Sequence, residues 1–263
     1  MAASSAQIGS SIAAIREDRE HGASFLARKA VRTMVMAARS VPAGAGVEDY
    51  LRGLARELAR ARPTMVPIRN AVARFLEQME ATGCWDSEAA ARVGREVEGL
   101  LEHAVVQAAA RAAAMIRDGS RVLTCSYSST VARALVEAHR SCKALSVLVL
   151  ESGSGHTAHG RRLASELAKA GLDARVVADR DMGKVVKVAD LALVGADRVL
   201  PGGDVVNGAP SLELALACRG ASVPFYVVAD SFKLDSEGAP QALEPGFQLV
   251  PARLIAAVIT EEG

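Results

Sequence analysis

The first part of the chain places apolar residues three to four positions apart among arginine, glutamate and lysine side chains. This spacing is typical of amphipathic helices. Six positions define it: Ile12, Ile15, Phe25, Leu26, Val31 and Val35. The pattern predicts helices throughout residues 1–118, which we expect to form a helical N-terminal domain. The stretch 41–46 predicts a loop.

Two further helices are expected before the pattern changes. One covers about 48–60, and a long Ala-rich helix covers 87–117. Between them the run Arg62-Pro63-Thr64 breaks the pattern, and Pro63 is placed to open the next helix. The long helix ends near Asp118-Gly119, a common type of helix stop.

From residue 120 onward, short runs rich in β-branched residues alternate with helical segments. The runs are 121–125, 146–152, 174–179, 191–197 and 224–230, and the helices lie near 129–140, 157–170 and 210–219. Alternation of this kind predicts a mostly parallel sheet covered by helices on both faces. We therefore expect an α/β protein whose C-terminal, Rossmann-like domain spans residues 119–263.

Composition and charge narrow the function classes. The 263 residues carry a net charge of +1 and only 3% aromatic side chains, which argues against nucleic-acid binding. No apolar run reaches the roughly 20 residues that a membrane helix needs, and no signal peptide is evident. The cysteines form no C-x-x-C pair, so neither zinc nor a disulfide framework is expected. A cytoplasmic protein without metal fits best.

Ligands of open parallel sheets bind beyond the carboxyl ends of the strands. The loop Cys125–Thr130 occupies such a position and is rich in hydroxyl groups, with Ser128, Ser129 and Thr130 at the start of a predicted helix. Free N–H groups and hydroxyls at a helix start favour phosphate binding. The alternative is an ordinary helix cap with spare serines.

A second loop has the form G-x-G-x-x-A from Gly153 to Ala158, and Asp179 ends the following strand. Taken alone, this pattern indicates a dinucleotide site. It follows the second strand of the region instead of the first, and Glu151 adds a negative charge where a pyrophosphate would approach. A nicotinamide enzyme is therefore kept only as an alternative.

A third segment places Asp197 at a strand end and Asn207 shortly before a helix. A carboxylate beside a phosphate-binding rim suits general acid–base catalysis. The alternative for Asp197 is the cap of a turn.

Several motifs stand in the order found in one known superfamily. They are Arg62-Pro63-Thr64, Gly195-Ala196-Asp197-Arg198, Gly203-Asp204-Val205-Val206-Asn207, Pro224-Phe225-Tyr226-Val227 with Lys233 after it, and Val258-Ile259-Thr260-Glu261. The chain resembles the superfamily that joins the α, β and δ regulatory subunits of the eukaryotic translation-initiation guanine-nucleotide exchange factor to sugar-phosphate isomerases. Those isomerases act on methylthioribose 1-phosphate or ribose 1,5-bisphosphate. The resemblance implies a two-domain fold and an oligomer built from dimers.

The resemblance also implies roles for individual residues. Asp197 matches the catalytic acid–base of the isomerases, and Asn207 and Lys233 match at the same spacing. Arg62 matches an arginine that holds a substrate phosphate. The turn Gly22-Ala23-Ser24 matches a glycine-rich turn that contacts substrate, and Ser128 and Ser129 fall in the loop after the catalytic cysteine.

Departures from the isomerase pattern cluster around this loop. Ser126 stands where the catalytic cysteine belongs, and Cys125 stands where a histidine belongs. A serine hydroxyl is a poor proton-transfer group without a base, and Cys125 serves only if the loop shifts by one residue. Gly208 replaces a lysine, and the run Glu151–Ser154 lacks an arginine. Two cationic contacts to a bisphosphate are therefore missing.

Two functions follow from these observations. The first is an aldose–ketose isomerase of a phosphorylated pentose, with Asp197 and either Ser126 or Cys125 as catalytic residues and no cofactor. The second is a regulatory protein that binds a sugar phosphate or nucleotide without turnover, because the serine-rich loop is most similar to the regulatory α subunit. Either is expected to be a homodimer or a larger homo-oligomer.

Overall fold

The computed structural model describes residues 5–41, 46–141, 144–154, 157–238 and 242–263. The chain forms two compact units, Met1–His103 and Ala104–Gly263. The division falls inside a single helix, α5 (Ser87–Met115). The domain boundary after residue 118 that the sequence suggests stays a prediction, and so does the 41–46 loop, because residues 42–45 lie outside the described residues.

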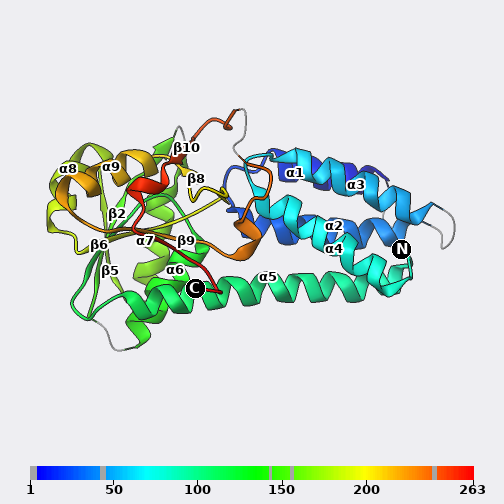
Figure 1. The fold of residues 1–263 in the computed structure, drawn as a ribbon, viewed down its shortest axis with the longest axis horizontal. Helices are drawn as coiled ribbons and strands as arrows, with labels where there is room; N and C mark the ends of the chain where they lie inside the picture. Colours follow the sequence, from blue (N-terminus) through cyan, green and yellow to red (C-terminus); the bar gives the residue numbers. More distant parts are fainter. Residues whose placement is uncertain (1–4, 42–45, 142–143, 155–156, 239–241) are drawn as a thin grey trace. The chain divides into compact units, whose positions relative to one another are not determined.

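The first unit is helical, as predicted, and is coloured from blue through cyan to green in Figure 1. It contains α1 (Ser5–Arg16), α2 (Ala23–Ser40), α3 (Val47–Ala61), α4 (Val66–Thr82) and the first half of α5. The prediction that Pro63 opens a helix is wrong. Helix α4 begins at Val66 with Pro67 in its first turn, where the missing N–H of proline costs no helical hydrogen bond.

Helix α5 packs closely on α2 within this unit. A Cβ atom at Gly94 would lie 2.3 Å from Cγ2 of Val35, so only glycine permits this approach. Arg28 of α2 pairs with Glu102 of α5 at 2.7 Å. The apolar stripe that the sequence shows on α2 therefore faces its neighbouring helices.

The second unit is built on a six-stranded parallel sheet with the order β11-β9-β6-β1-β2-β5. Counted along the chain, this is the order of a doubly wound Rossmann-like sheet. The fold class predicted from the sequence is confirmed. The strands are β1 (Arg121–Thr124), β2 (Ser146–Leu150), β5 (Asp173–Val177), β6 (Leu191–Gly195), β9 (Phe225–Val228) and β11 (Ala257–Ile259).

Helices cover both faces of the sheet (Figure 1). Along β1, Val122 faces α6 and α7 while Leu123 faces α9, as the alternation of side chains along a strand requires. The helices are α6 (Ser129–Arg140), α7 (His159–Lys169), α8 (Met182–Val185) and α9 (Ser211–Ala221), with short 3₁₀ turns η1 (Asp179–Asp181), η2 (Val186–Val188), η3 (Ser231–Lys233) and η4 (Ala252–Leu254).

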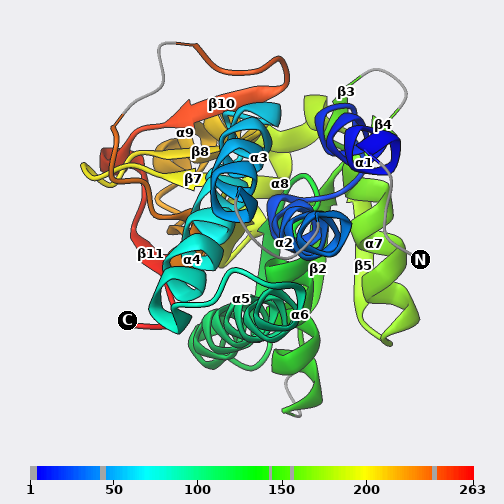
Figure 2. The same cartoon turned by 90° about the vertical axis from the view of Figure 1, so that its right-hand side faces the viewer.

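Two small antiparallel sheets were not predicted. One has the order β10-β8-β7, and the other pairs β3 with β4. Figure 2 shows β10, β8 and β7 next to α9. The strands are β3 (Gly153–Ser154), β4 (Thr157–Ala158), β7 (Arg198–Val199), β8 (Val205–Gly208) and β10 (Phe247–Val250). The first of these sheets holds the segment that follows Asp197.

Candidate functional site

The strand order sets where a ligand should bind in the second unit. Strand β1 lies between β6 and β2, and its connection leads toward β2 whereas β6 connects toward β9. The crevice of a doubly wound sheet opens at this reversal, outside the carboxyl ends of the strands. The loops after β1 and β6 carry Ser126 and Asp197, so both predicted catalytic positions flank the switch point.

The loop after β1 has an uncommon backbone. Ser126 has a φ of +60°, and Ser152, after the neighbouring strand β2, has a φ of +50°. Residues with a side chain rarely adopt this left-handed conformation, and such strain is found most often at functional sites. Two adjacent strand ends therefore turn sharply at a serine.

Hydrogen bonds join these two turns. Ser126 N donates to Ser152 Oγ at 2.7 Å, and Ser152 Oγ donates to the Leu150 carbonyl at 3.1 Å. Ser152 N in turn donates to Oδ1 of Asp179 at 3.0 Å. Asp179 is the acidic residue of the dinucleotide pattern, and here its carboxylate stabilises the turn at Ser152, which in turn accepts a hydrogen bond from Ser126 N.

A buried cluster holds Asn207 on the other side of this loop. Asn207 Nδ2 donates to Ser211 Oγ at 2.8 Å, and Ser211 Oγ donates to the Gly208 carbonyl at 2.6 Å. Ser211 has one hydroxyl proton, so the thiol of Cys125, 3.4 Å away, is the donor toward Ser211 Oγ. The cluster fixes the Asn207 amide at the end of β8.

Cys125 has the properties of a core residue. Burial raises the pKa of its thiol to about 12, so the thiol is protonated at neutral pH. A thiol of this kind does not supply the thiolate needed for proton transfer or nucleophilic attack. In this conformation Ser126 is the member of the pair that is partly exposed at the strand end.

Asp197 follows β6 and is partly exposed, and its N–H donates to the Val206 carbonyl at 2.9 Å. That bond places it beside Asn207. Gly195, two residues earlier, packs closely against Ser128. A Cβ atom at Gly195 would lie only 2.5 Å from Ser128 Oγ. The loop after β1 thus rests on the end of β6.

The hydroxyl groups of the serine-rich loop differ in exposure and in hydrogen bonding. Ser128 caps α6, since its Oγ accepts from Val131 N at 3.3 Å. Thr130 is fully buried, and its Oγ1 has no hydrogen-bond partner among the described residues. Ser129 is exposed. Capping therefore accounts for one of the hydroxyls, and Ser126 and Ser129 are left facing outward.

Lys233 ends η3, just after β9. Its side chain is 4% exposed, and Nζ lies 3.5 Å from Oδ2 of Asp230, whose side chain is 1% exposed. Neither carboxylate oxygen of Asp230 has a hydrogen-bond partner among the residues that the structure describes. Ser231 N, between them, donates to both oxygens of Glu261 at 3.0 Å, which ties η3 to the segment after β11.

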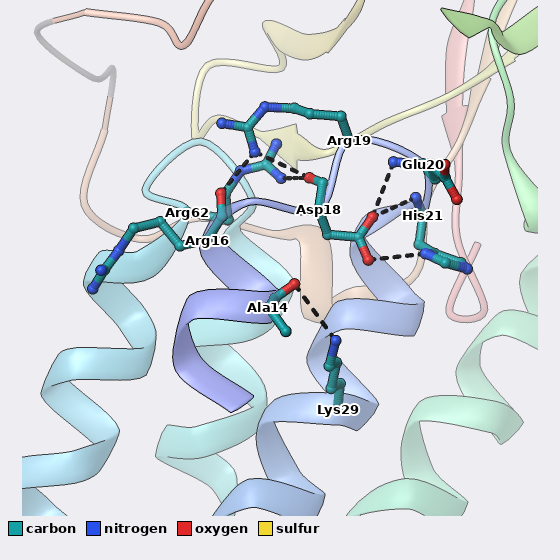
Figure 3. A network of polar contacts seen from close by, with 8 residues as sticks. All are labelled: Ala14, Arg16, Asp18, Arg19, Glu20, His21, Lys29 and Arg62. Atoms are coloured by element: carbon teal, nitrogen blue, oxygen red, sulfur yellow. Dashed lines mark hydrogen bonds and ion pairs between the residues drawn. The ribbon is translucent and has the colours of Figure 1, made fainter. Parts of the chain in front are cut away.

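Arg62, a predicted site residue of the first unit, lies with Asp18 at the turn between α1 and α2 (Figure 3). Gly22 is the N-cap of α2, and Ala23 and Ser24 are buried in its first turn. Arg62 is 3% exposed, and its Nη1 donates to the Asp18 carbonyl. Arg62 therefore fixes the turn that carries Gly22; its predicted phosphate contact stays a prediction.

The Asp18 carboxylate organises the same turn. It accepts from the N–H groups of Glu20 and His21 at 2.9 Å each, and from His21 Nδ1 at 2.9 Å. Partial burial acts to raise the pKa of Asp18, but these hydrogen bonds outweigh it and the pKa is lowered. The ring of His21 also stacks on Phe25, with centroids 4.0 Å apart.

The sequence predicts the site residues near the strand ends but not the residues that hydrogen-bond to them. The structure brings Ser126, Asp197 and Asn207 to neighbouring strand ends of the second unit, and it places Arg62 and Gly22 at one turn of the first unit. Ser152, Ser211 and Asp230 were not predicted, although the short polar runs after each strand were a usable signal. Gly155 and His156 of the G-x-G-x-x-A loop lie outside the described residues.

Within the described ranges, no group of three or more His, Cys, Asp or Glu side chains is arranged to hold a metal ion. No described helix has the length and apolar character needed to cross a membrane.

Comparison with known proteins gives a consistent family assignment. Residues 19–241 match the Initiation factor 2 subunit family. A protein of Pyrococcus horikoshii named "Putative translation initiation factor eIF-2B subunit 2-like" is 32% identical over 83% of this chain and 76% of its own length. The crystal structure of the P. horikoshii translation initiation factor eIF-2B has a TM-score of 0.86 at 27% identity, covering 98% of this chain and 96% of that one.

Sugar-phosphate isomerases are also among the relatives. The ribose 1,5-bisphosphate isomerase of Archaeoglobus fulgidus is 25% identical over 95% of this chain and 86% of its own length. The methylthioribose-1-phosphate isomerase of Pelotomaculum thermopropionicum is 30% identical over 95% of this chain and 80% of its own length. Both branches of the resemblance seen in the sequence are thus confirmed.

Proposed function

Because the chain belongs to the Initiation factor 2 subunit family, we propose that it binds a phosphorylated pentose at the switch point of its sheet and interconverts the aldose and ketose forms. The observation that carries this proposal is the placement of Asp197, partly exposed at the end of β6, beside Asn207 and across the switch point from Ser126. The names of two relatives, isomerases of phosphorylated pentoses, support the substrate class.

The phosphate group is assigned to the start of α6. The first N–H groups of a helix have no partner within the helix, and the helix dipole favours an anion there. Ser128 already caps Val131 N, so the exposed Ser129 and the preceding Ser126 supply the hydroxyl contacts. Arg62 and the Gly22–Ser24 turn of the first unit are assigned to ligand binding on the resemblance alone.

Asp197 is assigned the proton transfer. In an aldose–ketose isomerisation a proton leaves C2 and a proton arrives at C1, and the sugar keeps its composition, so no external oxidant or reductant takes part. The Asp197 carboxylate takes the C2 proton and returns it to C1, while the bond between C1 and the ring oxygen breaks and the proton of the C2 hydroxyl passes to that ring oxygen. The Asn207 amide, held by Ser211, donates to the oxygen that gains negative charge, as preorganised donors do in such sites.

A second candidate function has its own support. Cys125 is buried with a pKa of about 12, and Ser126, which occupies the position of the family's catalytic cysteine, has no described hydrogen bond to a base. Both features favour a protein that binds a sugar phosphate or nucleotide and reports its presence without turning it over. A nicotinamide site has weaker support, because Asp179 is engaged with Ser152.

Phosphorus NMR of the full chain separates the two functions. Ribose 1,5-bisphosphate and methylthioribose 1-phosphate are added in turn, and ketose phosphate resonances are expected with at least one of them. Asp197→Asn should abolish these resonances while the aldose signal still broadens on binding. Broadening without conversion by the unaltered protein would favour the regulatory function, and no broadening with either sugar would overturn the proposal.

We also expect a homo-oligomer, as the family resemblance implies. Light scattering coupled to size exclusion should give a mass that is a multiple of the 27.4 kDa chain. A monomeric mass at all protein concentrations would contradict this expectation and leave the ligand proposal standing.

A further inference from the structure

We infer that Asp230 and Lys233 together bind two neighbouring hydroxyl groups of the ligand, so that this ion pair recognises the diol of a phosphorylated sugar and not its phosphate. The inference rests on the proposed function, because it assigns further ligand groups to the same site. It goes beyond that function by giving Asp230 a binding role and by assigning sugar hydroxyl groups to Lys233.

Both side chains are buried, and the hydrogen-bonding capacity of the Asp230 carboxylate is unused within the described part of the chain. Both are less than 5% exposed, and the separation of 3.5 Å between Nζ and Oδ2 is an ion pair without a hydrogen bond. Neither Asp230 oxygen has another donor among the described residues. Buried carboxylates and ammonium groups are nearly always hydrogen-bonded, because removing them from water without partners is strongly unfavourable. A ligand that enters here supplies the missing partners.

A surface ion pair with the same spacing in sequence, Asp181 and Lys184, shows that the separation of Asp230 and Lys233 is unusual. Lys184 Nζ donates to Oδ1 of Asp181 at 2.8 Å, and both side chains are solvent-accessible. The Asp-x-x-Lys spacing therefore permits a direct hydrogen bond. Asp230 and Lys233 are buried, where such a bond would be stronger, and yet they are held apart.

The charge of the pair selects the kind of ligand group. Lys233 and Asp230 carry opposite charges, so the pair as a whole is neutral. A phosphate placed against Lys233 would also face the Asp230 carboxylate, and the two negative charges would repel each other. A hydroxyl group donates its proton to a carboxylate oxygen and accepts from the ammonium. Two adjacent hydroxyls use both oxygens of Asp230.

The position in the sheet fits this assignment. Gly195 of β6 is paired with Val228 of β9, and Asp197 and Asp230 each follow two residues later. Strand β6 lies between β1 and β9. A phosphorylated pentose would therefore place its phosphate at the start of α6, its carbons C1 and C2 at Asp197 and its neighbouring 2- and 3-hydroxyls at Asp230.

Calorimetric titration of the full chain tests the inference. The ligand is ribose 1,5-bisphosphate or methylthioribose 1-phosphate, whichever binds more tightly, compared with its 2-deoxy counterpart. We expect the unaltered protein to bind the 2-deoxy sugar about tenfold to a hundredfold more weakly, the range for one hydrogen bond to a charged group. Asp230→Asn should weaken the hydroxylated sugar to the same degree and leave inorganic phosphate binding unchanged. The matched control Asp181→Asn should alter neither affinity.

Two results would overturn the inference and leave the proposed function intact. One is equal affinity of the unaltered protein for the sugar and its 2-deoxy form, a comparison that needs no variant and so holds even if Asp230→Asn does not fold. The other is an Asp230→Asn protein that loses phosphate and sugar binding to the same extent. If the unaltered protein binds neither sugar, the proposed function itself fails and the inference fails with it.

Discussion

The guanidinium of Arg198 pairs with the carboxylate of Asp235, and the two side chains are 6% and 0% exposed. Arg198 Nη2 also donates to the Gly238 carbonyl at 2.6 Å. This pair joins the strand that begins just after Asp197 to the loop that begins just after Lys233. It therefore helps to fix the spacing between Asp197 and Lys233.

Removing one partner of this pair should be costly. Asp235→Asn would leave the Arg198 charge buried and uncompensated, and we expect it to lower the free energy of unfolding by about 3–5 kcal/mol. Urea denaturation monitored by circular dichroism measures the change. The exposed pair of Asp173 and Arg175 is the control, because Asp173→Asn should have little effect. Equal decreases in the free energy of unfolding for Asp235→Asn and Asp173→Asn would contradict a special cost for breaking the buried Arg198–Asp235 pair.

A methyl group at Gly195 should displace the loop that carries Ser126. An added Cβ would lie 2.5 Å from Ser128 Oγ and 2.7 Å from Ser128 Cβ, so Gly195→Ala should destabilise the fold by about 1–3 kcal/mol and weaken sugar-phosphate binding. The change Ser128→Gly in the same protein should restore part of the lost stability. Gly202→Ala, at a position with nothing nearby, is the control. Gly195→Ala with unaltered stability and affinity would contradict the packing of Ser128 on β6.

Replacing Ser126 with glycine should have two separate effects: relief of backbone strain should stabilise the fold, and loss of the hydroxyl should weaken ligand binding. Ser126 and Ser222 have φ values of +60° and +57°, a conformation that favours glycine by about 1 kcal/mol. Ser126→Gly and Ser222→Gly should therefore both raise the melting temperature. Only Ser126→Gly should weaken ligand binding, because Ser222 lies at the end of α9, away from the site. Destabilisation by Ser126→Gly would mean that the hydroxyl itself supports the fold.

The thiols should differ in reactivity. Burial raises the pKa of Cys125 and of Cys218 to about 12, whereas Cys84 is exposed. In a Cys84→Ser/Cys142→Ser protein, from which the other two thiols have been removed, we expect almost no reaction with a disulfide reagent at pH 8 until the protein is unfolded. A rapid reaction of one thiol in the folded protein would point to Cys125 in an accessible, reactive form.

His159 should stay neutral at lower pH than an ordinary histidine. Burial, and then the charge of Arg162, lower its pKa below the usual 6.5. The folded state then binds fewer protons than the unfolded state, so stability falls as the pH drops below 6.5 and levels off below the folded pKa. An NMR titration of the ring measures this. Arg162→Gln should raise the pKa part of the way, and Arg161→Gln should not. A pKa at or above 6.5 would contradict the environment described here.

Much of the fold could be predicted from local pattern. All five apolar runs became strands, and the helix expected at 129–140 is α6, because the composition and periodicity of these segments match their conformation. The small sheet β10-β8-β7 was missed, since its strands are short and partly polar. Pro63 was misplaced because a nearby proline, Pro67, satisfies the same preference at the true helix start.

Only those site residues that follow a predicted strand could be placed from the sequence. Asp197 and Ser126 follow predicted strands, so their gathering at one edge could be inferred, whereas Asn207 lies within β8, which was not predicted. Ser152 supports Ser126 from 26 residues away, and no periodicity in sequence indicates such a contact. The same holds for Gly160, where a Cβ would lie 1.8 Å from the Leu150 carbonyl; this glycine, outside the G-x-G-x-x-A pattern, is the one that lets α7 approach β2.

The contact between Ser126 and Gly208 ties together two of the departures from the isomerase pattern. A Cβ at residue 208 would lie 3.0 Å from Ser126 Oγ, closer than side chains normally approach. A lysine restored at 208 would press on the serine, and a cysteine restored at 126 would bring a larger sulfur atom toward the same backbone. The two positions are therefore sterically coupled, and the effects of substitutions at 126 and 208 on stability are expected not to be additive.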